Sequence, residues 1–232
     1  MSTLSRELDQ EENESLSFQD ISRILSGRVK SASIVYSDLE TIRGNYSLAR
    51  ILGSHDCACC LVTARRGRQV QRHWCTLLRI KGKIYWFDSL ALPFSELDSL
   101  IGDNKLTSFL KKVKAVPNHR KLQAHLSKVK TCGCWTALRC AKYKLTNQQF
   151  VTWITSGNPR MDLDRKVAML CYIGLQTWKN TKNTPKTLKN TKKTTKKPPK
   201  TRFYATCWNW RLINANKRDF RTKHGLSWGV GG

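Results

Sequence analysis

The 232-residue sequence has no uninterrupted run of about eighteen apolar residues, the length that a membrane-spanning helix needs. Acidic residues are scarce, because 16 Asp and Glu stand against 42 Lys and Arg, which gives a formal net charge of +26. So large a charge exceeds what solubility requires and indicates a polyanionic partner, nucleic acid first, unless it is simply a solvated basic surface. We therefore expect no membrane span and an affinity for nucleic acid.

A secretory signal peptide is also absent, and the nine cysteines are an odd number. A disulfide-stapled secreted domain would show an even set behind such a signal. The sequence therefore favours a reducing compartment, in which the thiols stay free.

Composition divides the chain into four parts. Residues 1–16 are polar and acidic, which predicts a flexible leader, and residues 17–178 carry apolar side chains at strand and helix spacings, which predicts one folded domain. Residues 179–202 hold many cations, three prolines and no acid, which predicts a disordered Lys/Thr-rich linker. Residues 203–232 mix aromatic with basic side chains, which can stack on bases, dock in a protein groove or pack back onto the domain.

The stretch 73–90 contains two runs rich in β-formers with Lys81-Gly82 between them. This dipeptide predicts a two-residue hairpin turn, because glycine readily adopts the positive φ that such a turn needs. The turn sets the register: Ile80 faces Lys83, and every further pair keeps the same index sum.

Extending this ladder places Cys75 opposite Asp88 and His73 opposite Leu90. His73 and Asp88 then lie on one face as diagonal neighbours, about 7 to 8 Å apart between backbones, within reach of side chains that lean together. The hairpin can therefore supply a general base with a carboxylate to orient it. A half-buried strand histidine and an Asp that begins a turn are the simpler alternatives.

Cys132-Gly133 opens a stretch whose apolar residues follow helical spacing, which predicts a buried helix that starts near Gly133. Cys132 then lies at a helix N-terminus, where free N–H groups and the helix dipole stabilise a thiolate. Gly133 leaves the backbone amides open to a developing oxyanion. Cys134 and Cys140 on the same helix are expected to be small core residues.

Gln123 precedes Cys132 by nine residues, and it either donates its side-chain amide to an oxyanion or is an ordinary surface residue. Thiol, imidazole, carboxylate and amide together predict a cysteine peptidase, in an order that differs from papain, where the cysteine precedes the histidine. The catalytic candidates are His73, Asp88 and Cys132, and the oxyanion candidates are Gln123 and Gly133.

On these residues the chain resembles the adenain-like cysteine proteases, the adenovirus-type maturation enzymes, and is more distantly similar to the SUMO-specific proteases. The shared motifs are His73-Trp74, Asp88, Gln123 and Cys132-Gly133. Weaker similarity in CACCLVTARRGRQV and SGNPRMDLDRKV extends the resemblance over about residues 20–176. Asp88 departs from the Glu of the adenovirus enzymes, and Gln123 lies about two residues farther from the cysteine than usual.

The resemblance implies an α+β fold, a central mixed β-sheet flanked by helices, with the nucleophile at the N-terminus of a buried helix. It implies an endopeptidase that cleaves viral capsid or core precursor proteins at Gly-containing sites during virion maturation, in the host nucleus and the virion. It implies DNA and a basic activating peptide from a capsid protein as activators, and no metal or other cofactor. The basic tail would replace or supplement that peptide, and we expect a monomer.

Sequence-independent DNA contacts are expected from the basic linker. The residues are Lys179, Lys182, Lys186, Lys189, Lys192, Lys193, Lys196, Lys197, Lys200 and Arg202.

Two alternatives stay open. The first keeps the fold but changes the substrate, to conjugates of SUMO or other ubiquitin-like modifiers. The second is a zinc-stabilised nucleic-acid-binding protein without catalysis, with Cys57, Cys60, His73 and Cys75 as ligands.

Overall fold

The computed structural model describes residues 15–26, 33–66, 69–124, 129–156 and 162–183, and the single residues 6, 9, 13 and 29. Within these ranges the side chains of residues 65, 66, 69 and 176–183 are not described. The chain divides into two units, residues 1–185 and 186–232, and the structural account concerns the first. The expected tail, residues 203–232, lies outside the described residues.

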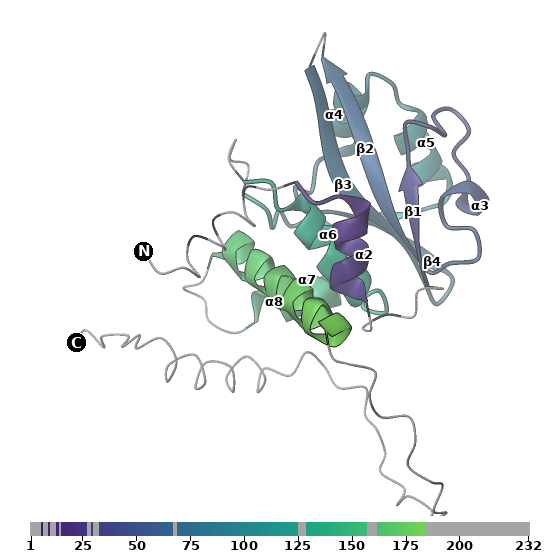
Figure 1. Cartoon of the computed structure of the whole chain (residues 1–232). Coiled ribbons are helices and arrows are strands. Elements are labelled where there is room, and N and C mark those ends of the chain that lie inside the picture. The colour runs from purple at the N-terminus through teal and green to yellow at the C-terminus, as the bar shows by residue number, and fades with distance from the viewer. Residues whose placement is uncertain are drawn as a thin grey trace, which may run out of the picture. The chain divides into compact units, whose positions relative to one another are not determined.

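A five-stranded mixed sheet forms the centre of the fold, with the strands in the order β1-β2-β3-β4-β5 (Figure 1). The outer pairs β1–β2 and β4–β5 are parallel, and the inner pairs β2–β3 and β3–β4 are antiparallel. The fold is therefore α+β with a mixed sheet, as expected. The strands are β1 (Ile34–Asp38), β2 (Cys57–Arg66), β3 (Gln69–Ile80), β4 (Lys83–Asp88) and β5 (Val116–Pro117).

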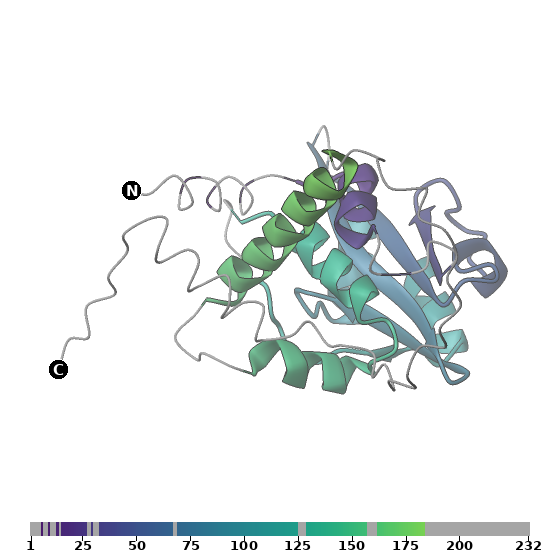
Figure 2. The same ribbon diagram turned by 60° about the horizontal axis from the view of Figure 1, so that its bottom comes forward.

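Helices cover both faces of the sheet (Figures 1 and 2). One face packs against α3 (Leu48–Ile51), α4 (Phe94–Ile101) and α5 (Lys105–Lys112), through a core that joins helix residues to alternate strand residues. The other face meets α6 (Cys132–Ala141) and α7 (Asn147–Thr155), while α2 (Phe18–Leu25) and α8 (Leu163–Asn183) pack against α6.

The two-sided cover explains the apolar run at the start of β2. Successive strand residues point to opposite faces, so a strand with one solvated face would alternate apolar with polar residues. Cys57, Ala58, Cys59 and Cys60 are each 0% exposed. This part of β2 is therefore a central strand buried from both sides.

The predicted hairpin is confirmed. Lys81 and Gly82 both have positive φ, 49° and 78°, which matches the right-handed twist of the strands. Ile80 pairs with Lys83 in the predicted register.

The far end of the predicted ladder is wrong. Cys75 faces Asp88 as predicted, but β4 ends there, so His73 has no partner in Leu90. The chain turns instead, and the Leu90 amide donates to the Asp88 carboxylate (2.8 Å). The prediction that matters for a site, one shared face for His73 and Asp88, is unaffected.

The helix at Cys132-Gly133 is also confirmed: α6 begins at Cys132, and residues 133–140 are buried. Helix α8 departs from expectation because it continues through residues 179–183, the start of the predicted disordered linker. Once the N-terminal half of a helix is packed, each added residue gains a backbone hydrogen bond without a new nucleation cost, so even Lys, Asn and Thr extend it. No helix in the described part of the chain is both long and apolar enough to cross a membrane.

Candidate active site

His73 and Asp88 form the centre of the site. Nε2 of His73 lies 2.6 Å from Oδ1 of Asp88, and the Asp88 side chain is only 2% exposed. The amides of Leu90 and Leu92 also donate to this carboxylate, at 2.8 and 3.1 Å. Burial raises the pKa of Asp88, but the hydrogen bond and charge of His73 and these amides lower it below its ordinary value overall.

Asn118 fixes the backbone at Asp88, a role that the sequence did not reveal. Its Oδ1 accepts from the Asp88 amide (2.8 Å), and its Nδ2 donates to the Asp88 carbonyl (2.7 Å). Hydrogen bonds therefore fix the amide and the carbonyl of Asp88 as well as its carboxylate.

Cys132, the first residue of α6, is a further hydrogen-bond partner of His73. Burial raises the pKa of Cys132, but the hydrogen bond and charge of His73 and the amides of Trp74 and Gly133 lower it below that of a free thiol. These are the conditions in which a cysteine becomes a reactive thiolate.

His73 therefore bridges the thiol and the carboxylate. Burial lowers the pKa of His73, but its hydrogen bonds to Asp88 and Cys132 raise it well above its ordinary value. A raised imidazole pKa beside a lowered thiol pKa favours the thiolate–imidazolium pair over the neutral pair.

Cys75 is a second thiol beside His73, but it does not share the character of Cys132. Burial raises the pKa of Cys75 to about 12, although the charge of His73 opposes the shift. Among the described residues, one group could hold a metal ion: ligand atoms of His73, Cys75 and Asp88 all lie within 4.8 Å of one another. Two members of this group, His73 and Asp88, are close because they are hydrogen-bonded to each other at 2.6 Å.

Gln123 is buried, at 6% exposure, so the alternative of a surface glutamine is wrong. Ser89, the residue after Asp88, donates its hydroxyl to Oε1 of Gln123 (2.7 Å). The Leu122 and Gln123 amides both donate to the Ser89 carbonyl, at 2.9 and 3.0 Å. The structure thus attaches Gln123 to the same turn that holds Asp88.

Asp164 on α8 joins the two ends of the segment between Gln123 and Cys132. Its carboxylate accepts from the Ala124 amide (2.7 Å), the Thr131 hydroxyl and the Trp135 indole (2.9 Å). The sequence analysis missed this residue, although a signal existed. Asp164 shares helical spacing with Val167, Ala168 and Cys171, so it is an acid on the buried face of a helix.

Gly133 has a packing role that the sequence did not reveal. A Cβ added to Gly133 would lie 2.8 Å from Cβ of Leu16, closer than side chains tolerate. Leu16 is buried, and its carbonyl accepts from the Trp74 indole (2.9 Å). Leu16, at the end of the predicted leader, therefore belongs to the folded core and lies directly against the start of α6.

The four suggested zinc ligands, Cys57, Cys60, His73 and Cys75, do not form one cluster. The Cys57 thiol contacts Cys140 on α6 (3.1 Å between sulfurs), whereas Cys60 pairs with Cys75 in the sheet register and so belongs to the opposite face from Cys57. Cys134 and Cys140 are fully buried, as expected of core residues.

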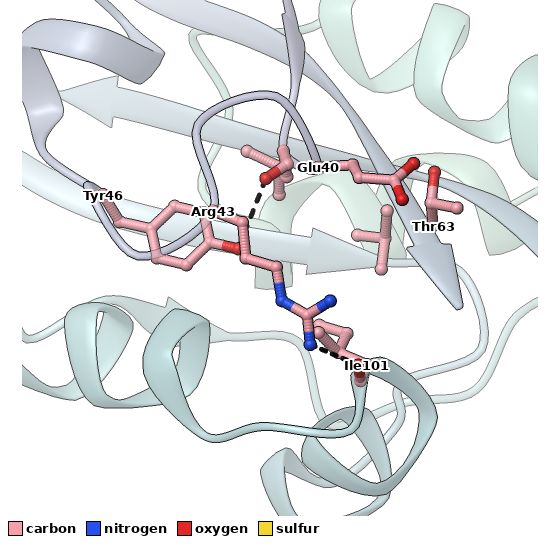
Figure 3. A pocket seen from close by; sticks show the side chains of 7 residues that line it. Glu40, Arg43, Tyr46, Thr63 and Ile101 are labelled. Carbon is pink, nitrogen blue, oxygen red and sulfur yellow. Dashed lines mark hydrogen bonds between the residues drawn. The ribbon is translucent and has the colours of Figure 1, made fainter. Parts of the chain in front are cut away.

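A small cavity elsewhere in the fold does not compete with this site. Figure 3 shows it between the turn after β1 and the end of α4, where the Arg43 guanidinium donates to the Ile101 carbonyl (2.9 Å). Its volume is about 10 Å³, room for about one water molecule.

The structure describes no side chain of the expected DNA-binding residues. Lys179 and Lys182 fall near the end of α8 without described side chains, and the others, from Lys186 to Arg202, lie outside the described residues.

No protein-family model matches the chain, and no curated protein matches it in sequence. Function must therefore be argued from the chemistry of the site.

Proposed function

We propose that the chain is a cysteine endopeptidase with His73, Asp88 and Cys132 as its catalytic residues. The observation that carries the proposal is one imidazole held between a buried carboxylate, at 2.6 Å, and a thiol of lowered pKa at a helix N-terminus. Structural histidines do not need both partners, whereas a base that contacts the nucleophile and is oriented by a third group is the signature of nucleophilic catalysis.

The reaction follows from these contacts. The Cys132 thiolate attacks the scissile carbonyl, and the carbonyl electrons move to the oxygen, which the Gln123 amide and the main-chain N–H groups at the start of α6, that of Gly133 included, stabilise. The His73 imidazolium then protonates the leaving amine as the C–N bond breaks. Neutral His73 next takes a proton from water as the water oxygen attacks the acyl carbon, and the C–S bond then breaks. The acid product leaves, the Cys132 thiolate and the His73 imidazolium are restored, and Asp88 keeps the ring oriented throughout.

The direct test is selective alkylation of the full chain by iodoacetamide, followed by peptide mapping. At about pH 6, roughly 2.5 pH units below the ordinary thiol pKa, Cys132 should react well before the other cysteines. Seven of those are buried, and Cys207 lies outside the described residues, so Cys207→Ser is the matched control. Equal labelling of Cys132 and Cys207 in the unmodified protein would contradict the proposal.

We further propose viral capsid or core precursor proteins as substrates, cut at Gly-containing sites in the host nucleus and the virion. The support is the resemblance of the motifs around His73, Asp88, Gln123 and Cys132. Viral-type peptides with a Gly at the cleavage site, assayed beside fluorogenic ubiquitin-like conjugates, separate this substrate class from the deconjugating alternative. Cleavage of the conjugates alone would reassign the substrate while keeping the chemistry.

DNA is the proposed polyanionic partner, on the support of the +26 net charge and of the lysines in the linker. Replacing the lysines between residues 186 and 200 by Gln in the full chain should weaken DNA binding for all sequences alike. Each lost phosphate contact should also reduce the salt slope of log K by about 0.9. Unchanged affinity at moderate salt would show that DNA binds to another surface of the protein.

A further inference from the structure

Ser89 is a buried serine whose hydroxyl has a specific partner. It is 1% exposed and donates to Oε1 of Gln123 at 2.7 Å. A side-chain amide has an acceptor oxygen on one side and a donor NH2 group on the other. Because Oε1 is held toward Ser89, the NH2 group of Gln123 is turned away from it.

This orientation matters because the opposite one would harm the reaction. An amide rotated by 180° would present a carbonyl oxygen to the negative charge that develops during attack by Cys132. Such a rotation turns only the terminal amide group, and it would require the Ser89 hydroxyl to accept a hydrogen bond where it now donates one. Here the Leu122 and Gln123 amides are both bound to the Ser89 carbonyl, at 2.9 and 3.0 Å, so backbone and side chain are fixed by one residue.

We propose that Ser89 is a positioning residue for the oxyanion site, which sets the donor end of Gln123 toward the carbonyl that Cys132 attacks. This inference rests on the proposed function. It makes the Asp88-Ser89 dipeptide the shared support of two groups, because Asp88 orients the base and Ser89 orients the oxyanion donor. The two act on different groups, so their substitutions have separable effects.

Two reactions of Cys132 distinguish this role from general support of the fold. Acylation by p-nitrophenyl acetate forms a tetrahedral oxyanion and requires no peptide specificity, whereas alkylation by iodoacetamide forms none. In the full chain, Ser89→Ala should slow acylation roughly tenfold or more, up to the ~10²–10³ expected for complete loss of one oxyanion donor. The alkylation rate and its pH profile should stay unchanged.

Two further comparisons make the test specific. Gln123→Ala should slow acylation at least as much as Ser89→Ala does, and the double variant should match Gln123→Ala because Ser89 then has nothing to orient. Ser108→Ala, on an exposed position of α5, is the control for a serine substitution. If Ser89→Ala fails to fold, Ser89→Thr and Ser89→Val have equal shape and differ in the hydroxyl, so the Thr variant should acylate faster.

Each result has a defined meaning. Slower acylation with normal alkylation supports the inference. Equal slowing of both reactions, or of neither, overturns it and leaves the proposed peptidase in place. If unmodified Cys132 is neither acylated nor preferentially alkylated, the proposed function fails, and the role of Ser89 fails with it.

Discussion

The hairpin β3–β4 and the segment from Gln123 to Cys132 each bring part of the proposed site into place, but by different means. In the hairpin, a two-residue turn sets the register, and the register places His73 and Asp88 on one face. The segment from Gln123 to Cys132 has no such local rule. Its ends are fixed by Ser89, which precedes Gln123 by 34 residues, and by Asp164, which follows Thr131 by 33 residues.

The difference concerns the range over which each geometry is determined. The register of a hairpin is set by its turn and by residues that are close in sequence. The segment from Gln123 to Cys132 depends on buried polar contacts between distant elements, where a lost partner leaves an unsatisfied group. Substitutions should therefore affect the hairpin side through chemistry and the other side through stability as well.

The largest expected effect is on chemistry. His73→Ala removes the group that lowers the pKa of Cys132, so the thiol pKa rises and the thiolate fraction at slightly acidic pH falls. Acylation should drop by roughly 10²–10⁴, the range for loss of a general base. The pH dependence of alkylation should move to higher pH. An unchanged alkylation profile would separate His73 from Cys132.

Asp164→Asn tests the segment from Gln123 to Cys132. An amide can accept from Thr131 and Trp135, but its NH2 group then faces the Ala124 amide, so one donor loses its acceptor. We expect a loss of about 1–3 kcal/mol in the free energy of unfolding and slower acylation. Asp162→Asn makes the same change of charge at an exposed position and should cost less than about 0.5 kcal/mol. Equal losses of stability in both variants would show that Asp164 contributes only its charge.

Gly133→Ala separates the two reasons for glycine at this position. If packing against Leu16 decides, the variant should lose about 1–3 kcal/mol of stability by overpacking, measured by urea unfolding. The loss should be smaller in a Leu16→Gly background, because glycine lacks the Cβ that lies 2.8 Å from the added atom. Normal stability with slow acylation would instead assign Gly133 to oxyanion access alone.

Gly82→Ala is expected to have the smallest effect. Its φ of 78° disfavours a side chain, so the variant should lose about 1 kcal/mol. Gly102→Ala is a close match, since Gly102 has φ 80° and neither glycine has an atom within 4 Å of an added Cβ. Preferential alkylation of Cys132 should persist in both variants, because β2 also holds β3 in register. Its loss in Gly82→Ala alone would show that the turn by itself maintains the site.

Much of the site could be predicted where short-range rules apply. The turn at Lys81-Gly82, the pairing of Cys75 with Asp88 and the start of α6 at Cys132 all follow from local pattern. The predicted pair of His73 with Leu90 failed because β4 ends when the Asp88 carboxylate binds the next amides. The predicted linker began too early because α8 extends from its packed half.

The sequence alone determined which groups are present and how the hairpin and α6 arrange them locally, because turn chemistry and side-chain periodicity act over a few residues. Tertiary structure alone decided that Gln123 is buried and that its side-chain oxygen accepts a hydrogen bond from Ser89. It also decided that Asp164 joins both ends of the segment between Gln123 and Cys132 and that Leu16 packs against Gly133. Those contacts link residues far apart in the chain. Their geometry exists only once the sheet and both layers of helices have packed.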